Sequence, residues 1–217
     1  MSLALLANEV TACARCPRLV RCRERAAREP PRRFARDAYW ARPVAGFGDP
    51  DARVVLVGLA PAANGANRTG RMFTGDRSGD FLFAALHRAG FASRATSTAR
   101  DDGLALAGAY VTSVVRCAPP GNKPTPRERD RCVAFLAREL ALLPHARAIV
   151  ALGGFAWTGV LRALATRDRP RFAHGAIAQV GTYALVGCYH PSQLNTFTGR
   201  LTASMIDEVL ARAARAG

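Results

Sequence analysis

Six cysteines are the side chains best suited to bind a metal in this 217-residue chain. Cys13 and Cys16 form a CxxC pair followed by proline, a tight turn that directs two thiolates at one centre. Cys117 and Cys132 lie in a second segment, the first near the end of a predicted strand and the second inside a predicted helix. Four thiolates from two distant segments can hold a tetrahedral zinc ion or an iron–sulfur cluster. Their spacing is compatible with zinc, with an iron–sulfur cluster and with no metal at all.

We expect these thiols to be reduced, because the sequence predicts a cytoplasmic protein. Residues 1–16 show no basic region ahead of a long apolar stretch, as a signal peptide would. No apolar run approaches the roughly 20 residues of a membrane span, so we expect no membrane partner. Cysteines in the cytoplasm bind metals or catalyse more often than they form disulfides.

Three segments rich in glycine, proline and asparagine follow predicted strands and carry most of the remaining polar chemistry. They read GLAPAANGANRTGRMFTGD over 58–76, CAPPGNKP over 117–124 and HPSQLNTFTGR over 190–200. The four glycines of the first segment allow the backbone to approach a ligand closely. The segment matches neither a Walker A loop nor a GxGxxG fingerprint, so we expect no nucleotide cofactor.

Alternating strands and helices must position these segments. The pattern predicts strands over 53–58, 108–115, 147–152 and 182–189, and helices over 81–90, 126–143, 155–164 and 199–214. Residues 92–107 and 166–180 are predicted to be connections. This alternation indicates an α/β fold in one domain over residues 1–217, with helices on both faces of a sheet. Ligands of such sheets bind at the carboxyl ends of the strands, where the three segments should meet.

The charge balance predicts a polyanionic partner. The chain has 31 basic and 16 acidic residues, a net charge of +15. A GC-rich genome explains arginine in place of lysine but not this excess, so nucleic acid is the expected partner. Ten arginines lie between Arg15 and Arg42 against three acids, which predicts a basic edge near the N-terminus. The alternative is an ordinary solvated charged face.

In three motifs the chain resembles the uracil-DNA glycosylase superfamily, and specifically its iron–sulfur branch, family 5 or uracil-DNA glycosylase B. The motifs are GLAPAANGANRTGRMFTGD, RCAPPGNKPTP and HPSQLNTFTGRLT, in that order, and the resemblance runs from Cys13 to the last helix. It implies a three-layer α/β/α sandwich around a four-stranded parallel sheet. It also implies a structural [4Fe–4S] cluster, with the ligands Cys13, Cys16, Cys117 and Cys132.

Removing uracil from DNA requires stabilisation of two opposite charges. The nucleotide is extruded at a cost of about a few kcal/mol, the sugar gains oxocarbenium character and the base leaves as an anion. The resemblance assigns Asp76 to orienting water and stabilising the cation, and His190 to donating a hydrogen bond to uracil O2 from a neutral imidazole. The alternative for Asp76 is a turn or helix-cap role, although Asp80 is the better candidate for an ordinary cap.

The resemblance also implies a set of base-binding residues. Phe73 would stack on the extruded base and Asn122 would contact the base or a water molecule. The alternatives are a core aromatic for Phe73 and a simple turn residue for Asn122. The remaining expected base-binding residues are Gly58, Leu59, Ala60 and Asn64.

Three positions depart from the related sequences. Leu59 stands where related glycosylases carry an acidic or amide residue, so Asp76 must take over the positioning of water. Asn64 stands where family 5 usually has histidine. Ser113, after Thr112, stands where the superfamily often has asparagine. The resemblance therefore implies a pocket that also admits other deaminated bases such as hypoxanthine.

The segment after His190 is expected to contact DNA. Its apolar tips would fill the gap left by the extruded base, and its polar residues would hold phosphates. The expected gap-filling residues are Gln193, Leu194, Asn195, Thr196 and Phe197, and the expected phosphate contacts are Ser192 and Arg200. The alternative for Leu194 and Phe197 is packing against the closing helix.

The sequence thus predicts a monomeric DNA-repair hydrolase that removes uracil and other deaminated bases without cutting the strand. Lys123 is the only lysine and has no clear route to the Schiff base that strand cleavage needs. One alternative is a relative that binds uracil-DNA without turnover or is trapped on it, with His190 as the nearest nucleophile. The other is a zinc-bearing nucleic-acid-binding module without enzymatic activity.

Overall fold

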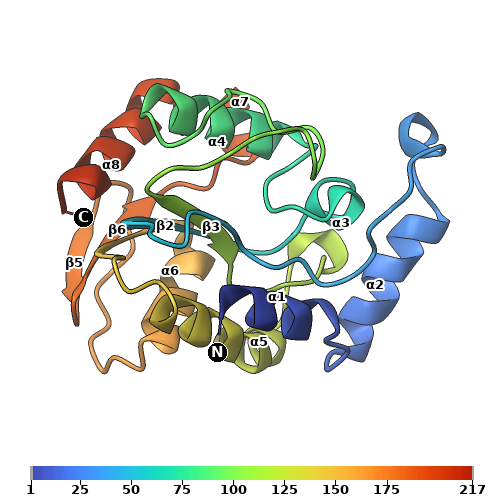
Figure 1. Cartoon of the computed structure of the whole chain (residues 1–217), viewed down its shortest axis with the longest axis horizontal. Helices are drawn as coiled ribbons and strands as arrows, with labels where there is room; N and C mark the ends of the chain where they lie inside the picture. Colours follow the sequence, from blue (N-terminus) through green and yellow to red (C-terminus); the bar gives the residue numbers. More distant parts are fainter. Residues whose placement is uncertain (1, 217) are drawn as a thin grey trace.

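The computed structural model describes residues 2–216 and has a central sheet between two layers of helices (Figure 1). The sheet that these residues form has six strands in the order β1-β3-β2-β4-β6-β5. The strands are β1 (Phe47–Gly48), β2 (Val54–Gly58), β3 (Ala109–Ser113), β4 (Ala148–Leu152), β5 (Ile177–Val180) and β6 (Tyr183–Cys188). Strands β3, β2, β4 and β6 run parallel. They correspond to the four predicted strands.

The prediction of a four-stranded sheet is incomplete, because an antiparallel strand lies at each edge. Strand β1 pairs with β3, and β5 pairs with β6. Strand β1 has only two residues, and β5 has exposed positions instead of a buried apolar run. Neither strand therefore has the hydrophobic pattern that revealed β2, β3 and β4, in which every residue is buried.

The helices form the two outer layers of the predicted α/β/α sandwich. They are α1 (Leu3–Thr11), α2 (Pro17–Arg28), α3 (Ala66–Thr69), α4 (Arg77–Arg88), α5 (Pro126–Ala141), α6 (Gly154–Ala163), α7 (Gln193–Phe197) and α8 (Ala203–Ala216), with 3₁₀ turns η1 (Arg32–Phe34) and η2 (Pro120–Asn122). Helices α4 and α8 share one buried core with the sheet, and α5 and α6 share the other. Helix α1 packs on α5. Within residues 2–216, every helix is too short or too polar to cross a membrane.

Several helix boundaries differ from the prediction for local reasons. Helix α4 begins at Arg77 because Asp76 caps it, whereas the sequence favoured Asp80 as the cap. The closing helix predicted over 199–214 is α8, which begins only at Ala203, and a short unpredicted helix, α7, precedes the turn at Gly199 with φ +71°. Helix α5 starts as predicted, with Thr125 and Glu128 forming a reciprocal capping box.

Candidate active site

A cleft of about 550 Å³ lies at the carboxyl ends of the parallel strands. Its walls come from the segments that follow β2, β3 and β6, as the parallel topology requires. The predicted site residues that line it are Leu59, Ala60, Phe73, Asp76, Asn122, His190, Ser192, Gln193 and Leu194. Sequence reasoning missed Pro61, Ala62, Ala66, Met72, Arg77 and Ser78, which complete the lining. Asp76 is the only carboxylate among the described residues that line the cleft.

Phe73 holds its ring in the cleft through an unusual backbone conformation. Its φ is +52°, which a bulky residue adopts only where the surrounding fold imposes it. The ring lies directly over Gly58, where an added Cβ would be 2.6 Å from Cζ of the phenyl group. Gly58 therefore lies beneath the cleft wall and allows the ring to approach the strand end. The centroids of the Phe73 and His190 rings are 6.1 Å apart, so both rings border the same space.

Asp76 is both a helix cap and a cleft residue. Its Oδ1 accepts a hydrogen bond of 3.0 Å from the backbone N–H of Gly79, and Oδ2 lies against Gly65, where an added Cβ would be 1.9 Å away. Burial raises the pKa of Asp76 above its usual range, and backbone hydrogen bonds from Gly79 and Ser78 partly oppose this. Asp80 lies in the first turn of α4, exposed and outside the cleft lining. The two roles considered for Asp76 are thus compatible.

His190 follows the end of β6 and is held there by hydrogen bonds to its backbone carbonyl. Its carbonyl oxygen accepts hydrogen bonds of 2.8 Å from the Ser192 N–H and from the Asn195 side-chain amide. Ser192 in turn caps the short helix α7. Burial lowers the pKa of His190 to about 4, so the imidazole is neutral at neutral pH. A neutral imidazole keeps one N–H donor, which suits the role expected of it.

His174 supports the same strand end and was missed because it lies in a segment assigned only as a connection. Its Nδ1 accepts a hydrogen bond of 3.2 Å from the N–H of Tyr189, the residue before His190. The ring centroids of His174 and Tyr189 lie 5.0 Å apart, and the Arg200 guanidinium lies 4.8 Å from the centroid of the Tyr189 ring. Arg200, expected to contact phosphate, is therefore next to the cleft but not in its lining. A single histidine without a motif gave no sequence signal.

Six predicted residues lie outside the cleft lining. These are Gly58, Asn64, Asn195, Thr196, Phe197 and Arg200. Asn64 accepts a hydrogen bond of 2.8 Å from the Tyr39 hydroxyl and faces a second groove. Asn195 is part of the α7 turn through its contact with the His190 carbonyl.

Ser113, which stands where the superfamily often has asparagine, lies beneath the cleft and is not part of its wall. Ser113 is 1% exposed, and its hydroxyl donates to the Val115 carbonyl at 2.8 Å. The same hydroxyl lies 3.5 Å from Sδ of Met72, which lines the cleft. The influence of Ser113 on a bound base must therefore pass through Met72.

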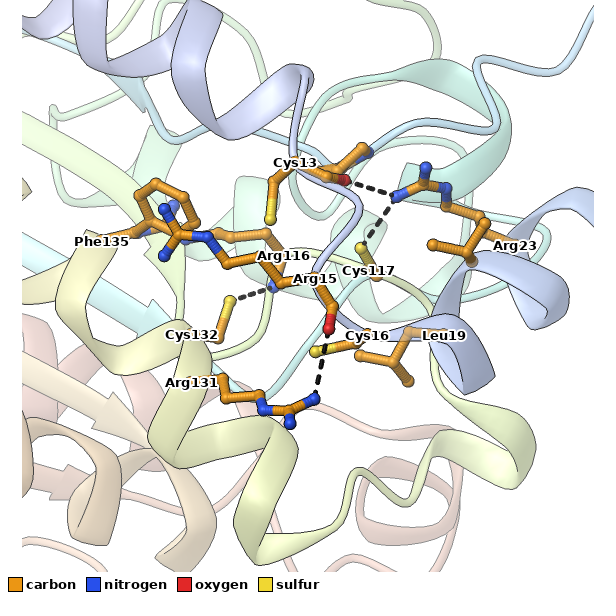
Figure 2. A pocket seen from close by; sticks show the side chains of 12 residues that line it. Cys13, Arg15, Cys16, Leu19, Arg23, Arg116, Cys117, Arg131, Cys132 and Phe135 are labelled. Carbon is orange, nitrogen blue, oxygen red and sulfur yellow. Dashed lines mark hydrogen bonds between the residues drawn. The ribbon is translucent and has the colours of Figure 1, made fainter.

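Four cysteines, from the loop between α1 and α2, the segment after β3, and α5, line a small cavity of about 20 Å³ (Figure 2). They are the predicted ligands Cys13, Cys16, Cys117 and Cys132. Nη1 of Arg23 donates to Sγ of Cys117 at 3.3 Å, and the Arg116 backbone N–H donates to Sγ of Cys132 at 3.3 Å. Burial raises the pKa of these two thiols, to about 11 for Cys117 and about 12 for Cys132.

The four thiols border one cavity but do not have the close geometry of metal ligands. Over residues 2–216, no group of three or more histidine, cysteine, aspartate or glutamate side chains is arranged to hold a metal ion. The segment that carries Cys117 is anchored by a buried ion pair between Arg116 and Glu139, with a shortest N–O distance of 2.6 Å. This pair fixes the end of β3 to α5, from which Cys132 projects.

Comparison with known proteins agrees with this fold. The family model described as the uracil DNA glycosylase superfamily matches residues 45–214. The chain is 53% identical over 208 residues to a type-5 uracil-DNA glycosylase of Mycobacterium tuberculosis, covering 94% of this chain and 78% of that protein. It is 53% identical over 214 residues to the type-5 enzyme of Mycobacterium leprae, covering 96% and 93%. For the type-5 enzyme of Thermus thermophilus the identity is 51% over 208 residues, covering 95% and 94%.

The sandwich fold is thus that of the uracil DNA glycosylase superfamily. Within that superfamily, the identities over nearly the whole chain show that it belongs to the type-5 uracil-DNA glycosylases. The family predicted from the three sequence motifs is confirmed.

Proposed function

We propose that the protein hydrolyses the N-glycosidic bond of uracil in DNA and leaves an abasic site. The observation that carries this proposal is the cleft, in which Phe73, Asp76, Asn122 and His190 converge from three separate segments. Its volume lies within the roughly 300–1,000 Å³ typical of small-molecule sites, which accommodates an extruded base. Type-5 relatives named for this reaction support the proposal.

The cleft provides each requirement of the reaction. The phenyl ring of Phe73 offers a face on which an extruded base can stack. His190 donates a hydrogen bond to the departing base as its negative charge develops. The Asp76 carboxylate stabilises the cationic sugar and orients the attacking water. Asn122, exposed at the rim, contributes an amide to the base or to that water.

The reaction stops at the abasic site. Strand cleavage by a lyase requires an amine that forms a Schiff base with the sugar. Lys123 is the only lysine of the chain, and it is exposed and absent from the cleft lining. We therefore assign a hydrolytic, monofunctional mechanism.

We further propose that the cleft accepts other deaminated bases, such as hypoxanthine. The lining residues Leu59, Ala60 and Met72 are apolar, and Ser113 lies beneath them without an amide to read a uracil edge. These apolar side chains offer no hydrogen bond that would distinguish one base from another.

The direct test of the function uses a labelled oligonucleotide with one uracil, treated with alkali after incubation to break abasic sites. We expect cleavage at the uracil only after alkali, and slower cleavage of a matched oligonucleotide with hypoxanthine. Tight binding without an alkali-labile site would instead indicate a protein that binds uracil-DNA without turnover. Cleavage before alkali would contradict the monofunctional assignment.

We propose that α7 fills the gap left by the extruded nucleotide. Leu194 and Phe197 are 72% and 68% exposed, which is inconsistent with packing against α8. The guanidinium of Arg77, a cleft residue, lies 5.2 Å from the centroid of the Phe197 ring and joins α7 to the start of α4. Gln193 and Asn195 belong to the same turn. Exposed apolar side chains beside a cleft for a flipped base suit insertion into the stack.

We propose that the four cysteines of the small cavity hold a structural [4Fe–4S] cluster. The chemistry of the donors fits, because four thiols share one cavity and two of their sulfurs already accept N–H hydrogen bonds. Nε of Arg23 is buried with no partner among the described atoms, so positive charge is available beside the thiolates. The cluster would join α2, the segment after β3 and α5, and supply rigidity rather than chemistry at the cleft.

The cluster assignment predicts a brown protein with broad visible absorbance and bound iron and sulfide. Cys132→Ala is expected to lose most of that absorbance and iron, because it removes one ligand. Cys22→Ala is the matched control, since Cys22 lies on α2 outside the cavity lining and should retain both. Metal analysis and an absorbance spectrum check this. Stoichiometric zinc without iron would contradict the proposed cluster and would favour the alternative of a zinc-bearing module.

We also propose a monomer acting on DNA in the cytoplasm. None of the six cysteines, all within residues 2–216, forms a disulfide, which agrees with a reducing compartment. The excess of positive charge suits an enzyme that searches DNA.

A further inference from the structure

A second groove continues from the cleft toward α2. It has a volume of about 350 Å³ and includes Arg25, Glu29 and Asn64 in its lining. Asn122 lines both the groove and the cleft, so the two hollows meet at this residue. Gly121 and Asn122 both have positive φ, +59° and +56°, and an added Cβ at Gly121 would meet no atom within 4 Å. The turn between the hollows is therefore open to solvent.

The wall of this groove belongs to a basic arm that projects from the body of the protein, formed by α2 and η1 (Figure 1). Several arginines of this region are already engaged. Arg18 pairs with Glu128 and Arg28 with Glu24, while Arg23 donates to Cys117. The contacts of Arg18 and Arg23 join the arm to other segments, whereas the pair of Arg28 lies within α2.

Other arginines of the arm carry unneutralised charge. Arg21 and Arg25 are exposed, lie one helical turn apart on α2, and form no ion pair with any residue from 2 to 216. Arg32 and Arg36 beyond the helix are exposed and likewise unpaired within this range. Glu29 is the acid in the groove lining. Of these arginines, Arg25 is in the groove lining and Arg21 lies one helical turn from it. Free guanidinium groups so placed are suited to successive phosphates of a nucleic-acid strand.

We propose that the DNA strand carrying the lesion leaves the cleft past Asn122 and lies in this groove, with its phosphates bound by Arg21 and Arg25. This inference rests on the proposed function and adds the path of one flank of the substrate. The groove begins at the rim where the nucleotide is extruded, so the phosphates next to the lesion reach it first. It can receive only one of the two flanks, 5′ or 3′, because it joins the cleft at one side.

The test uses two single-stranded oligonucleotides, with uracil near one end and about ten nucleotides on its 5′ or its 3′ side only. Binding is measured by fluorescence anisotropy at several salt concentrations for wild type and for the double variant Arg21→Ala, Arg25→Ala. We expect the variant to bind one oligonucleotide about tenfold more weakly near physiological salt, with the salt slope reduced by roughly 1.4, at about 0.7 per lost phosphate contact. Binding of the other oligonucleotide should not change.

Two further variants control for charge and folding. Arg212→Ala, Arg215→Ala removes the same charge from α8, whose end lies at the opposite side of the molecule in Figure 1, and should leave both affinities unchanged. Glu29→Gln should strengthen binding of the same oligonucleotide that the arginine variant weakens. An equal loss of affinity for both oligonucleotides, or no loss for either, would overturn the proposed path of the DNA strand through the groove. Absence of uracil removal by wild type would refute the function instead, since binding and cleavage are read separately.

Discussion

Replacing Asp76 with asparagine is expected to lower the single-turnover rate of uracil removal by roughly 10²–10³-fold and to leave stability nearly unchanged. Asparagine retains the oxygen that accepts the Gly79 N–H, so the cap of α4 survives. The substitution removes the negative charge that we propose stabilises the developing sugar cation. Asp76→Ala loses both functions and is expected to cost about 1 kcal/mol of stability in addition. Single-turnover assays and urea unfolding of both variants measure these effects separately.

Asp80→Asn is the matched control for this prediction. Asp80 lies four residues further along, in the first turn of α4, and is exposed outside the cleft lining. The same change of charge at this position should alter the rate less than about threefold, as expected of an exposed residue. If Asp76→Asn keeps the wild-type rate, Asp76 is only a cap and the positioning of water belongs to Asn122.

The pKa of Asp76 adds a pH dependence to this role. The carboxylate must be ionised to stabilise a cation, and burial raises its pKa above the usual range for aspartate. The rate should therefore begin to fall, as the pH is lowered, at a pH above the usual pKa range of aspartate. The raised pKa also favours the protonated group in the folded state, so its contribution to stability is present at low pH and is lost as the pH rises through the folded value.

The link between the cysteine cavity and the cleft lies in one short segment after β3. Cys117 lines the cavity and Asn122 lines the cleft, with Pro119 and Pro120 between them. Proline restricts the backbone, so the position of Asn122 follows from the position of Cys117. The Arg116–Glu139 ion pair holds the start of the segment against α5. A group that joins the cysteines would therefore also fix the rim where the cleft meets the α2 groove.

The sequence predicted the parts of the fold that have a strong hydrophobic period. The central strands were found because nearly all their residues are buried, and α5 because Thr125 and Pro126 mark its start. Strands β1 and β5 were missed because edge pairing leaves no apolar run. Helix α2 was missed because charged residues dominate it, although one side packs through the buried Leu19.

The candidate site was predictable where residues follow strand ends. Asp76 and His190 were assigned from motifs, and parallel topology explains why both line one cleft. The supporting residues were not predictable, since His174 acts through a hydrogen bond to the Tyr189 backbone that no spacing encodes. The burial of Ser113 beneath Met72 also depends on packing between separate segments.

His190→Ala is expected to lower the single-turnover rate by roughly 10²-fold, because it removes the proposed donor to the leaving base. His190→Gln retains a neutral N–H donor and should recover part of the loss. The variant His87→Ala, at an exposed position of α4, should keep the wild-type rate. A wild-type rate for His190→Ala would mean that the base leaves without this hydrogen bond.

Stability provides an independent check on the neutral state of His190. Its pKa of about 4 in the folded protein lies below the ordinary value of 6.5, so between these values the unfolded chain binds a proton that the folded protein does not. The free energy of unfolding of wild type should therefore fall as the pH drops from 6.5 toward 4. His190→Ala should lack this part of the slope in urea unfolding measured across that range. An equal slope in both proteins would mean that the pKa of His190 is not lowered in the folded state, and that burial does not keep its imidazole neutral.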